Sequence, residues 1–312
     1  MTEFFSHQHP QTLPGPRLLQ AAQAPDFQWP RHVNLNGCGL SQWPEALREA
    51  DNLESLSVYD NQLTHIPEWV STFTRLHTLN LSGNKFASLP AELGGLHSLR
   101  MLDLGHNELE SLPDCFGGLR ELRFLYVSNN GLTSLPDSMR TLVNLTYLNV
   151  TDNALTEPPD GLGELENLVE FRAYNNELMA LPHSIGQLRH LRELHVMQND
   201  LTQLPAELGQ CVNLREINAQ GNKLAHLPDS IGQLRNLAVL DLRFNELSEL
   251  PESMRELREL RFLDLRANRL TELPGWLPLL PRLEKLDLRW NRIDHVPDEF
   301  NGFLEKGGLL YL

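Results

Sequence analysis

Carboxylates recur at a fixed spacing in this chain, and paired carboxylates can perform acid–base chemistry. Two series each step by 23 residues, namely Glu170, Glu193 and Glu216, and Asp241, Asp264 and Asp287. Acid–base catalysis needs a site that excludes water and shifts pKa values. We expect these series on an open surface, where neighbouring arginines such as Arg243 keep the carboxylates ionised. The sequence therefore predicts no catalytic residue and a protein that is not an enzyme.

Histidines offer a second kind of chemistry, which is metal binding. His65, His226 and His295 occupy equivalent positions in the repeat described next, but in distant copies of it, so they cannot share one ion. His7 and His9 form at most an adventitious pair near the N-terminus. We expect no metal site and no cofactor.

The spacing of 23 comes from a repeat, seen clearly from Leu99 to Pro113 as L-x-x-L-x-L-x-x-N-x-L-x-x-L-P. Counting Leu99 as position 1, asparagine fills position 9 in eleven successive units: Asn61, Asn84, Asn107, Asn130, Asn153, Asn176, Asn199, Asn222, Asn245, Asn268 and Asn291. Cys38 takes this slot one step upstream, which makes twelve units. A fixed period of this size is the signature of a solenoid.

The repeat positions predict the geometry of each coil. Positions 4 and 6, such as Leu102 and Leu104, lie two residues apart and share the inner face of a strand. Position 5, such as Asp103, then points to the other face. An asparagine at position 9 can satisfy backbone groups inside the coil with both its donor and its acceptor. We expect one short parallel strand in each unit.

The pattern resembles the leucine-rich repeat family, over about residues 31 to 297. The Leu-Pro-x-x-Ile-Gly-x-Leu element at residues 227–234 is similar to the 23-residue subclass, found in Ras-group scaffold proteins and many bacterial proteins. The resemblance implies an α/β solenoid, or horseshoe, with a concave parallel β-sheet that usually binds another protein. It predicts twelve repeats plus a partial C-terminal strand.

Three segments follow from the period: a tail and N-terminal cap over residues 1–30, the solenoid over 31–297, and a C-terminal cap with a final edge strand over 298–312. Residues 16–22 are expected to form one or two helical turns, and Phe27 and Trp29 to cover the first coil. In the last strand, the frame assigns Leu309 to position 4 and Tyr311 to position 6, so both are expected to point inward.

Composition restricts the partners and the compartment. The formal net charge is −15, which disfavours binding to nucleic acid or to an anionic membrane. Three cysteines do not form a disulfide framework, and the first residues lack the features of a signal peptide. We expect a soluble, cytoplasmic monomer, with secretion into a host cell left open.

The resemblance implies that strand positions 3, 5, 7 and 8 face solvent on the concave surface, so these positions supply the candidate binding residues. Large aromatic, methionine and arginine side chains are enriched at interface hot spots. The central repeats carry such residues at Met101, Phe124, Tyr126, Tyr147, Arg172, Tyr174, His195 and Met197. The C-terminal repeats carry them at Arg243, Phe244, Arg266, Arg289 and Trp290. Cross-strand stacking and a salt-bridge network are the alternative interpretations of these two groups.

These residues predict a non-enzymatic scaffold that binds a partner protein on its concave face. The resemblance implies a small GTPase or other signalling protein as partner, or a host protein if the chain is a bacterial effector. The glutamates at positions 170, 193 and 216 are consistent with a basic partner, and the alternative is that Arg172, Arg192 and Arg215 offset their charge. Two alternatives remain: the repeat domain of a larger enzyme, such as a ubiquitin ligase or kinase, and a sensor of peptides or small molecules.

Overall fold

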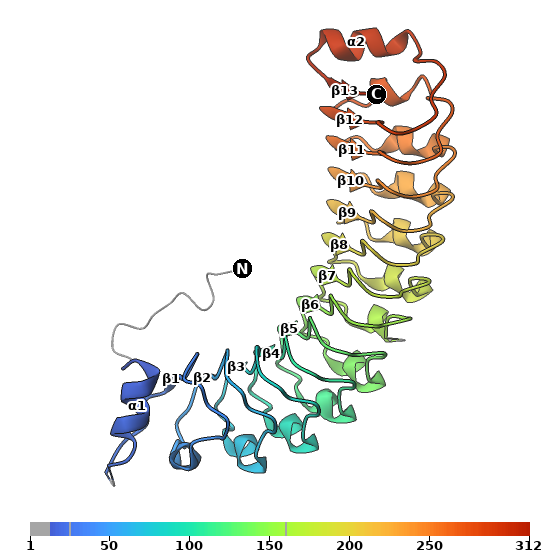
Figure 1. Cartoon of the computed structure of the whole chain (residues 1–312). Helices are drawn as coiled ribbons and strands as arrows, with labels where there is room; N and C mark the ends of the chain where they lie inside the picture. The colour runs from blue at the N-terminus through green and yellow to red at the C-terminus, as the bar shows by residue number, and fades with distance from the viewer. Residues whose placement is uncertain (1–12, 25, 160) are drawn as a thin grey trace. The chain divides into compact units, whose positions relative to one another are not determined.

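The computed structural model describes residues 13–24, 26–159 and 161–312. The chain forms two compact units, residues 1–132 and residues 133–312. Both are stacks of similar coils (Figure 1). His7 and His9 lie outside the described residues.

Each coil contributes one three-residue strand, and the strands of a unit lie in chain order and pair in parallel. The first unit contains β1 (His32–Asn34), β2 (Ser55–Ser57), β3 (Thr78–Asn80), β4 (Met101–Asp103) and β5 (Phe124–Tyr126). The second contains β6 (Tyr147–Asn149), β7 (Glu170–Arg172), β8 (Glu193–His195), β9 (Glu216–Asn218), β10 (Val239–Asp241), β11 (Phe262–Asp264), β12 (Lys285–Asp287) and β13 (Leu309–Tyr311). The predicted leucine-rich repeat solenoid with its parallel sheet is confirmed.

Short helices, nearly all 3-10 helices, form the other side of the coils. The first unit contains α1 (Gly15–Ala21), η1 (Glu45–Glu49), η2 (Glu68–Thr72), η3 (Ala91–Gly95) and η4 (Asp114–Gly118). The second contains η5 (Asp137–Thr141), η6 (Leu162–Glu164), η7 (His183–Gln187), η8 (Ala206–Gln210), η9 (Asp229–Gln233), η10 (Glu252–Glu256), η11 (Leu277–Leu279) and α2 (Glu299–Glu305). Most 3-10 helices follow the proline of a Leu-Pro pair, as Pro228 caps η9, because proline fixes the backbone for a turn.

A glycine near the end of these helices lets successive coils pack closely. A Cβ atom on Gly209 in η8 would lie 2.5 Å from the carbonyl oxygen of Ser230 in η9. No side chain fits at that distance, so glycine is required by the spacing of the coils rather than by its backbone angles.

The core fills the space between the strands and the helices, and the asparagine ladder satisfies the backbone inside it. Asn222 donates to the carbonyl oxygens of Val196 at 2.9 Å and Ala219 at 3.0 Å. Its side-chain oxygen accepts from the backbone N–H of Leu201 at 3.0 Å. Asn222 thus joins its own coil to the preceding one, and it satisfies backbone groups inside the coil as the sequence predicts.

The described residues before the first coil form a short helix, Gly15–Ala21, and an aromatic pair. Helix α1 buries Leu18, and Phe27 packs edge-on against Trp29 at 5.3 Å between ring centres. The indole N–H of Trp29 donates to the carbonyl oxygen of Ala46 at 2.8 Å. These contacts attach the segment to the first coil.

The orientation of β13 corrects the sequence-based prediction for Leu309 and Tyr311. Lys285 pairs with Leu309 and Asp287 pairs with Tyr311, so the last step is 24 residues rather than 23. The α-helix α2 replaces the usual 3-10 helix in this coil, and Gly307 turns the chain with a φ of +85°. Because side chains alternate along a strand, a slip of one residue reverses the faces. Leu309 and Tyr311 therefore point outward.

Candidate functional site

The open face of each unit is the strand surface that carries repeat positions 3, 5, 7 and 8. In the first unit it contains the predicted residues Met101, Phe124 and Tyr126. Met101 is buried among its neighbours, whereas Phe124 and Tyr126 are half-buried.

The predicted central residues of the second unit are also only partly accessible. Tyr147 and His195 are buried, and Arg172, Tyr174 and Met197 are half-buried. Parallel strands bring equivalent positions to about 5 Å, so bulky side chains cover each other. The guanidinium of Arg172 lies 5.9 Å from the centre of the Tyr147 ring. The proposed central patch draws on both units and stays a prediction.

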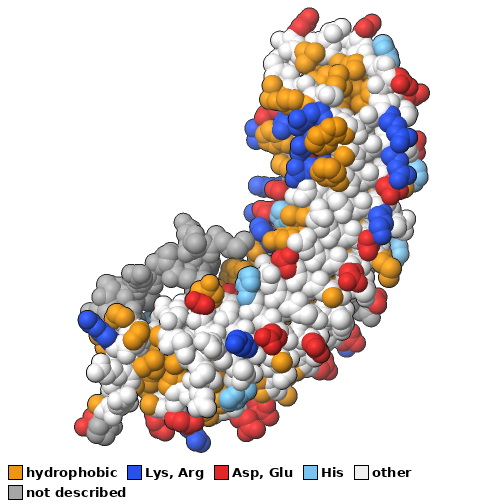
Figure 2. Space-filling model, in the orientation of Figure 1, with side chains coloured by type: hydrophobic (Ala, Val, Ile, Leu, Met, Phe, Trp, Pro, Cys, Tyr) orange, Lys and Arg blue, Asp and Glu red, His pale blue; other side chains and the backbone are white. Residues whose placement is uncertain are grey.

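On the open face of the second unit, the most exposed large aromatic side chains lie near the ends of β10 and β12. Phe244 is 51% exposed and Trp290 is 65% exposed. Their ring centres lie 6.2 Å apart, and the small residue Ala267 occupies position 8 of the coil between them. In Figure 2, hydrophobic and Lys or Arg side chains gather in the upper part of the view, where Figure 1 shows these strands.

Both aromatic residues have a left-handed backbone. The φ angle is +56° at Phe244 and +64° at Trp290. Gly221 occupies the same repeat position with a φ of +66°, and the turn after each strand imposes this conformation. Side chains of this bulk are genuine outliers at positive φ, and the cost is about 1–2 kcal/mol per residue.

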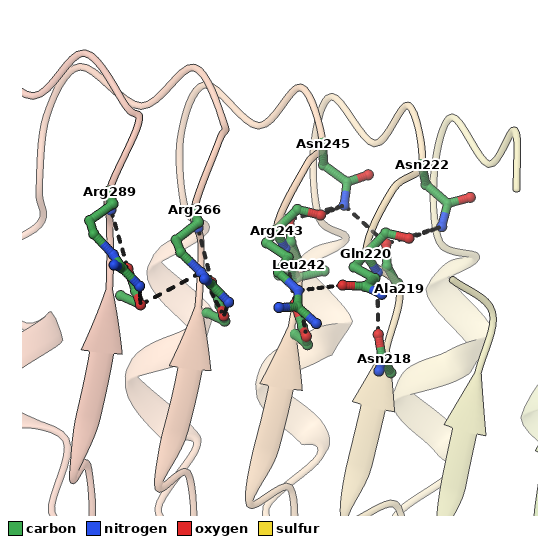
Figure 3. A network of polar contacts seen from close by, with 12 residues as sticks. Asn218, Ala219, Gln220, Asn222, Leu242, Arg243, Asn245, Arg266 and Arg289 are labelled. Atoms are coloured by element: carbon green, nitrogen blue, oxygen red, sulfur yellow. Dashed lines mark hydrogen bonds and ion pairs between the residues drawn. The ribbon is translucent and has the colours of Figure 1, made fainter. Parts of the chain in front are cut away.

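Arginines at position 7 form a ladder beside the aromatic pair, supported by aspartates at position 5. Arg289 donates to both carboxylate oxygens of Asp287 at 2.9 and 2.8 Å, and Arg266 pairs in the same way with Asp264. Asp287 also lies 3.5 Å from Arg266. The predicted salt-bridge network is therefore present (Figure 3).

The third arginine, Arg243, has a mixed set of partners. It pairs with Asp241 at 3.1 Å and donates to the side-chain oxygen of Gln220 on the preceding coil. Figure 3 shows the three guanidinium groups side by side at the ends of β10, β11 and β12.

The pKa values of two aspartates in this network are shifted in opposite directions. Asp287 is 1% exposed, and burial raises its pKa, but the hydrogen bonds and charge of Arg289 and Arg266 more than offset this, so the pKa lies below its ordinary value. Burial raises the pKa of Asp241 above its ordinary value, and the hydrogen bond and charge of Arg243 only partly compensate. The network is therefore tightest around Asp287.

Tyr311 and Leu309 extend this surface, and sequence reasoning missed them because it assigned the wrong register to β13. Leu309 is 52% exposed and Tyr311 is 39% exposed. The guanidinium of Arg289 lies 5.8 Å from the ring centre of Trp290 and 5.3 Å from that of Tyr311. We call the following set the aromatic–arginine surface: Arg243, Phe244, Arg266, Arg289, Trp290 and Tyr311.

A second polar cluster lies on β7 and β8. The ligand atoms of Glu170, Glu193 and His195 all lie within 4.8 Å of one another, and Glu170 accepts a hydrogen bond from Arg172. The sequence identified the glutamate series and His195 separately. Glu170 and Glu193 occupy position 3 and His195 occupies position 5 of adjacent strands. This proximity in the repeat could have identified the three residues as one cluster.

Comparisons with known proteins agree with this architecture. Family models described as "Leucine-rich repeat region" match residues 70–173 and 206–291, and those described as "Leucine Rich Repeat" match residues 52–73 and 282–303. No curated protein sequence matches the chain. Among the described residues, no helix is long and apolar enough to span a membrane.

Solved structures give the same picture. A leucine-rich repeat protein of Leptospira interrogans is 30% identical with a TM-score of 0.86, over 96% of this chain and 82% of that one. The plant peptide hormone receptor RGFR1, solved with RGF2, is 27% identical with a TM-score of 0.61, over 86% and 53%. A chain from the complex of latrophilin 3, Unc5D and FLRT2 is 25% identical with a TM-score of 0.64, over 80% and 77%. The chain belongs to the leucine-rich repeat family.

Proposed function

We propose that this chain is a non-enzymatic scaffold that captures a partner protein on the open face of β10 to β13. Leucine-rich repeat domains are protein-interaction scaffolds, and the neighbours described above include a receptor and a multiprotein complex. The aromatic–arginine surface is the proposed contact area. The observation that carries the proposal is the exposure of Phe244 and Trp290 in a strained backbone conformation.

Stability does not account for these two aromatic residues. About half of Phe244 and about two thirds of Trp290 remain in water, so burial recovers only part of their hydrophobic free energy. The positive φ costs free energy that glycine or asparagine would avoid. Strained residues persist at sites where their side chains have a function. Exposed tryptophan, flanked by arginine, has the composition of an interface hot spot.

The arginines are prepared for binding because the aspartates hold them from one side. Arg266 and Arg289 use their Nε and one terminal nitrogen for the aspartates. Among the described residues, their other terminal nitrogen, Nη1, has no hydrogen-bond partner. Guanidiniums fixed in this way lose little side-chain entropy when they bind. They suit a partner surface that combines carboxylates with apolar side chains.

The proposal extends to the compartment and the assembly state. The cysteines at positions 38, 115 and 211 are all free, which supports a reducing environment such as the cytoplasm. The partner is a signalling protein of the same cell or, for a chain delivered into a host, a host protein. We propose that the chain acts as a monomer and that its negative charge keeps nucleic acid away.

Site-specific photocrosslinking in the native cell tests this proposal. A photoreactive phenylalanine analogue at Phe262, which is exposed on β11, is expected to yield one dominant protein adduct. The same analogue at Met179 is the matched control, because that side chain is 62% exposed but lies outside the strands. Equal adducts at both sites, or none at position 262, would contradict the proposal.

A further inference from the structure

The cluster of Glu170, Glu193 and His195 has the composition of a metal site. The strand register places Glu170 beside Glu193 and Arg172 beside His195. Their ligand atoms fall within 4.8 Å of one another without any rearrangement of the backbone. None of these residues belongs to the aromatic–arginine surface, so the inference is independent of the proposed docking function.

His195 is directed into this cluster. Its side chain is 9% exposed, and its Nε2 atom lies 3.3 Å from Oε2 of Glu193. Among the described residues, the ring makes no hydrogen bond outside the cluster. In the tautomer that carries its proton on Nδ1, the Nε2 atom of this buried imidazole offers its lone pair to an ion between itself and Glu193.

The local charge also favours a divalent cation. Glu216 on β9 continues the series beside Glu193, so three glutamates stand at strand spacing. Arg172 pairs with Glu170, and no ion pair among the described residues joins Arg192 or Arg215 to these glutamates. The three carboxylates and the one guanidinium carry a net formal charge of −2, which one divalent ion would balance.

We propose that Glu170, Glu193 and His195 bind one Zn²⁺ ion, with water completing the coordination. Imidazole together with carboxylate is a donor set that suits zinc, whereas calcium and magnesium prefer oxygen alone. Zinc holds such atoms at about 2.0–2.2 Å, so two ligands of a tetrahedral site lie about 3.4 Å apart. The contact between His195 and Glu193 already has this length. Arg172 orients Glu170 from outside the coordination sphere, as carboxylate ligands commonly require.

Zinc titration of the metal-free full-length protein tests the site by calorimetry. The titration uses a background in which His7 and His9 are both replaced by alanine, which removes the competing N-terminal pair. One equivalent is expected to bind. His195→Ala and Glu193→Gln are each expected to weaken binding by about 100-fold or more, since even outer-sphere changes cost about 10–100-fold.

His183→Ala is the matched control, because His183 forms a comparable pair with Glu207 at 2.8 Å without a third ligand. Its zinc affinity is expected to stay unchanged. Co²⁺ provides a second measurement, with visible absorption bands of a tetrahedral site in the background protein and not in His195→Ala. Circular dichroism verifies that each variant is folded.

Three outcomes would overturn the inference. The first is stoichiometric binding that His195→Ala and Glu193→Gln leave intact. The second is binding in the unaltered protein that disappears when His7 and His9 are replaced, which would identify an adventitious ion only. The third is the absence of stoichiometric binding. Each is distinct from failure of the docking proposal, which crosslinking at position 262 tests without zinc.

Discussion

At the scale of single residues, repeat position 8 shows what the sequence could and could not predict. The sequence placed Phe244 and Trp290 on the solvent-facing side, and their exposure confirms this. It did not reveal their positive φ angles. Most other coils have Gly, Asn, Asp or another polar residue at position 8, where a positive φ causes less strain. Only the backbone angles show that these exposed aromatic residues also raise the conformational free energy of the folded chain.

Burial was the other residue property that the pattern missed. Met101, Tyr147 and His195 occupy solvent-facing positions but are buried by neighbouring side chains of the same face. The accessibility of a side chain on an open sheet depends on the volumes of its neighbours on the adjacent strands. Those neighbours belong to other repeats, so the pattern of one repeat does not reveal whether the side chain is accessible.

The aspartate network gives a prediction at this scale. Asp287→Asn is expected to destabilise the fold by about 1–3 kcal/mol at neutral pH, because Asp287 receives charged hydrogen bonds while buried. Its pKa is lowered, so its contribution is present above the ordinary value of 3.8 and is lost as the pH falls through the lowered pKa. Thermal unfolding between pH 7 and pH 2 measures the effect.

Asp241→Asn is the control for this experiment. The pKa of Asp241 is raised by burial, so its ionised form opposes folding at neutral pH, and neutralising it is expected to cost less than neutralising Asp287. Two results would contradict this account of the network. One is an equal loss of stability in the two variants, and the other is a difference in stability between Asp287→Asn and the unaltered protein that grows as the pH falls.

At the scale of the secondary-structure element, the repeat predicted the coil and its ladder, and it failed where one element changed type. Strand positions follow from leucines two residues apart, and Asn222 makes the bonds expected of it. In the last coil an α-helix replaces a 3-10 helix. The frame then slips by one residue, so Leu309 and Tyr311 face outward. Position counting cannot anticipate such a slip, because it assumes a constant period.

Helix packing supplies the prediction at this scale. Gly209→Ala is expected to destabilise the second unit by about 1–3 kcal/mol, the usual cost of overpacking, because its Cβ would meet the carbonyl oxygen of Ser230 at 2.5 Å. Gly302→Ala in α2 is the matched control, since no atom lies within 4 Å of its added Cβ. Alanine is the better helix former there, by about 0.5–1 kcal/mol.

Chemical denaturation distinguishes the two glycine variants. The account expects the midpoint to fall for Gly209→Ala and to stay level or rise for Gly302→Ala. If both midpoints changed in the same direction and by similar amounts, close approach of the coils would not be the reason for glycine at position 209.

At the scale of the whole molecule, stability in a solenoid is approximately a sum over repeats and their interfaces. A single exposed side chain can therefore change without loss of the fold. The regular period revealed the family and the number of repeats from the sequence alone. The partner could not be inferred in this way, because solvent-facing positions vary freely without breaking the pattern.

The central claim is that the aromatic–arginine surface captures a partner protein, and quantitative affinity capture from the native cell tests it most directly. The measurement compares the unaltered protein with the double variant Phe244→Asn and Trp290→Asn, and with Met179→Asn as an exposed control away from the strands. Asparagine tolerates a positive φ, so the double variant is expected to melt at the same or a higher temperature than the unaltered protein. The amount of partner that it captures is expected to fall by at least about tenfold, which is equivalent to about 1.4 kcal/mol of binding free energy. Undiminished capture by the folded double variant, or an equal loss with Met179→Asn, would contradict the account.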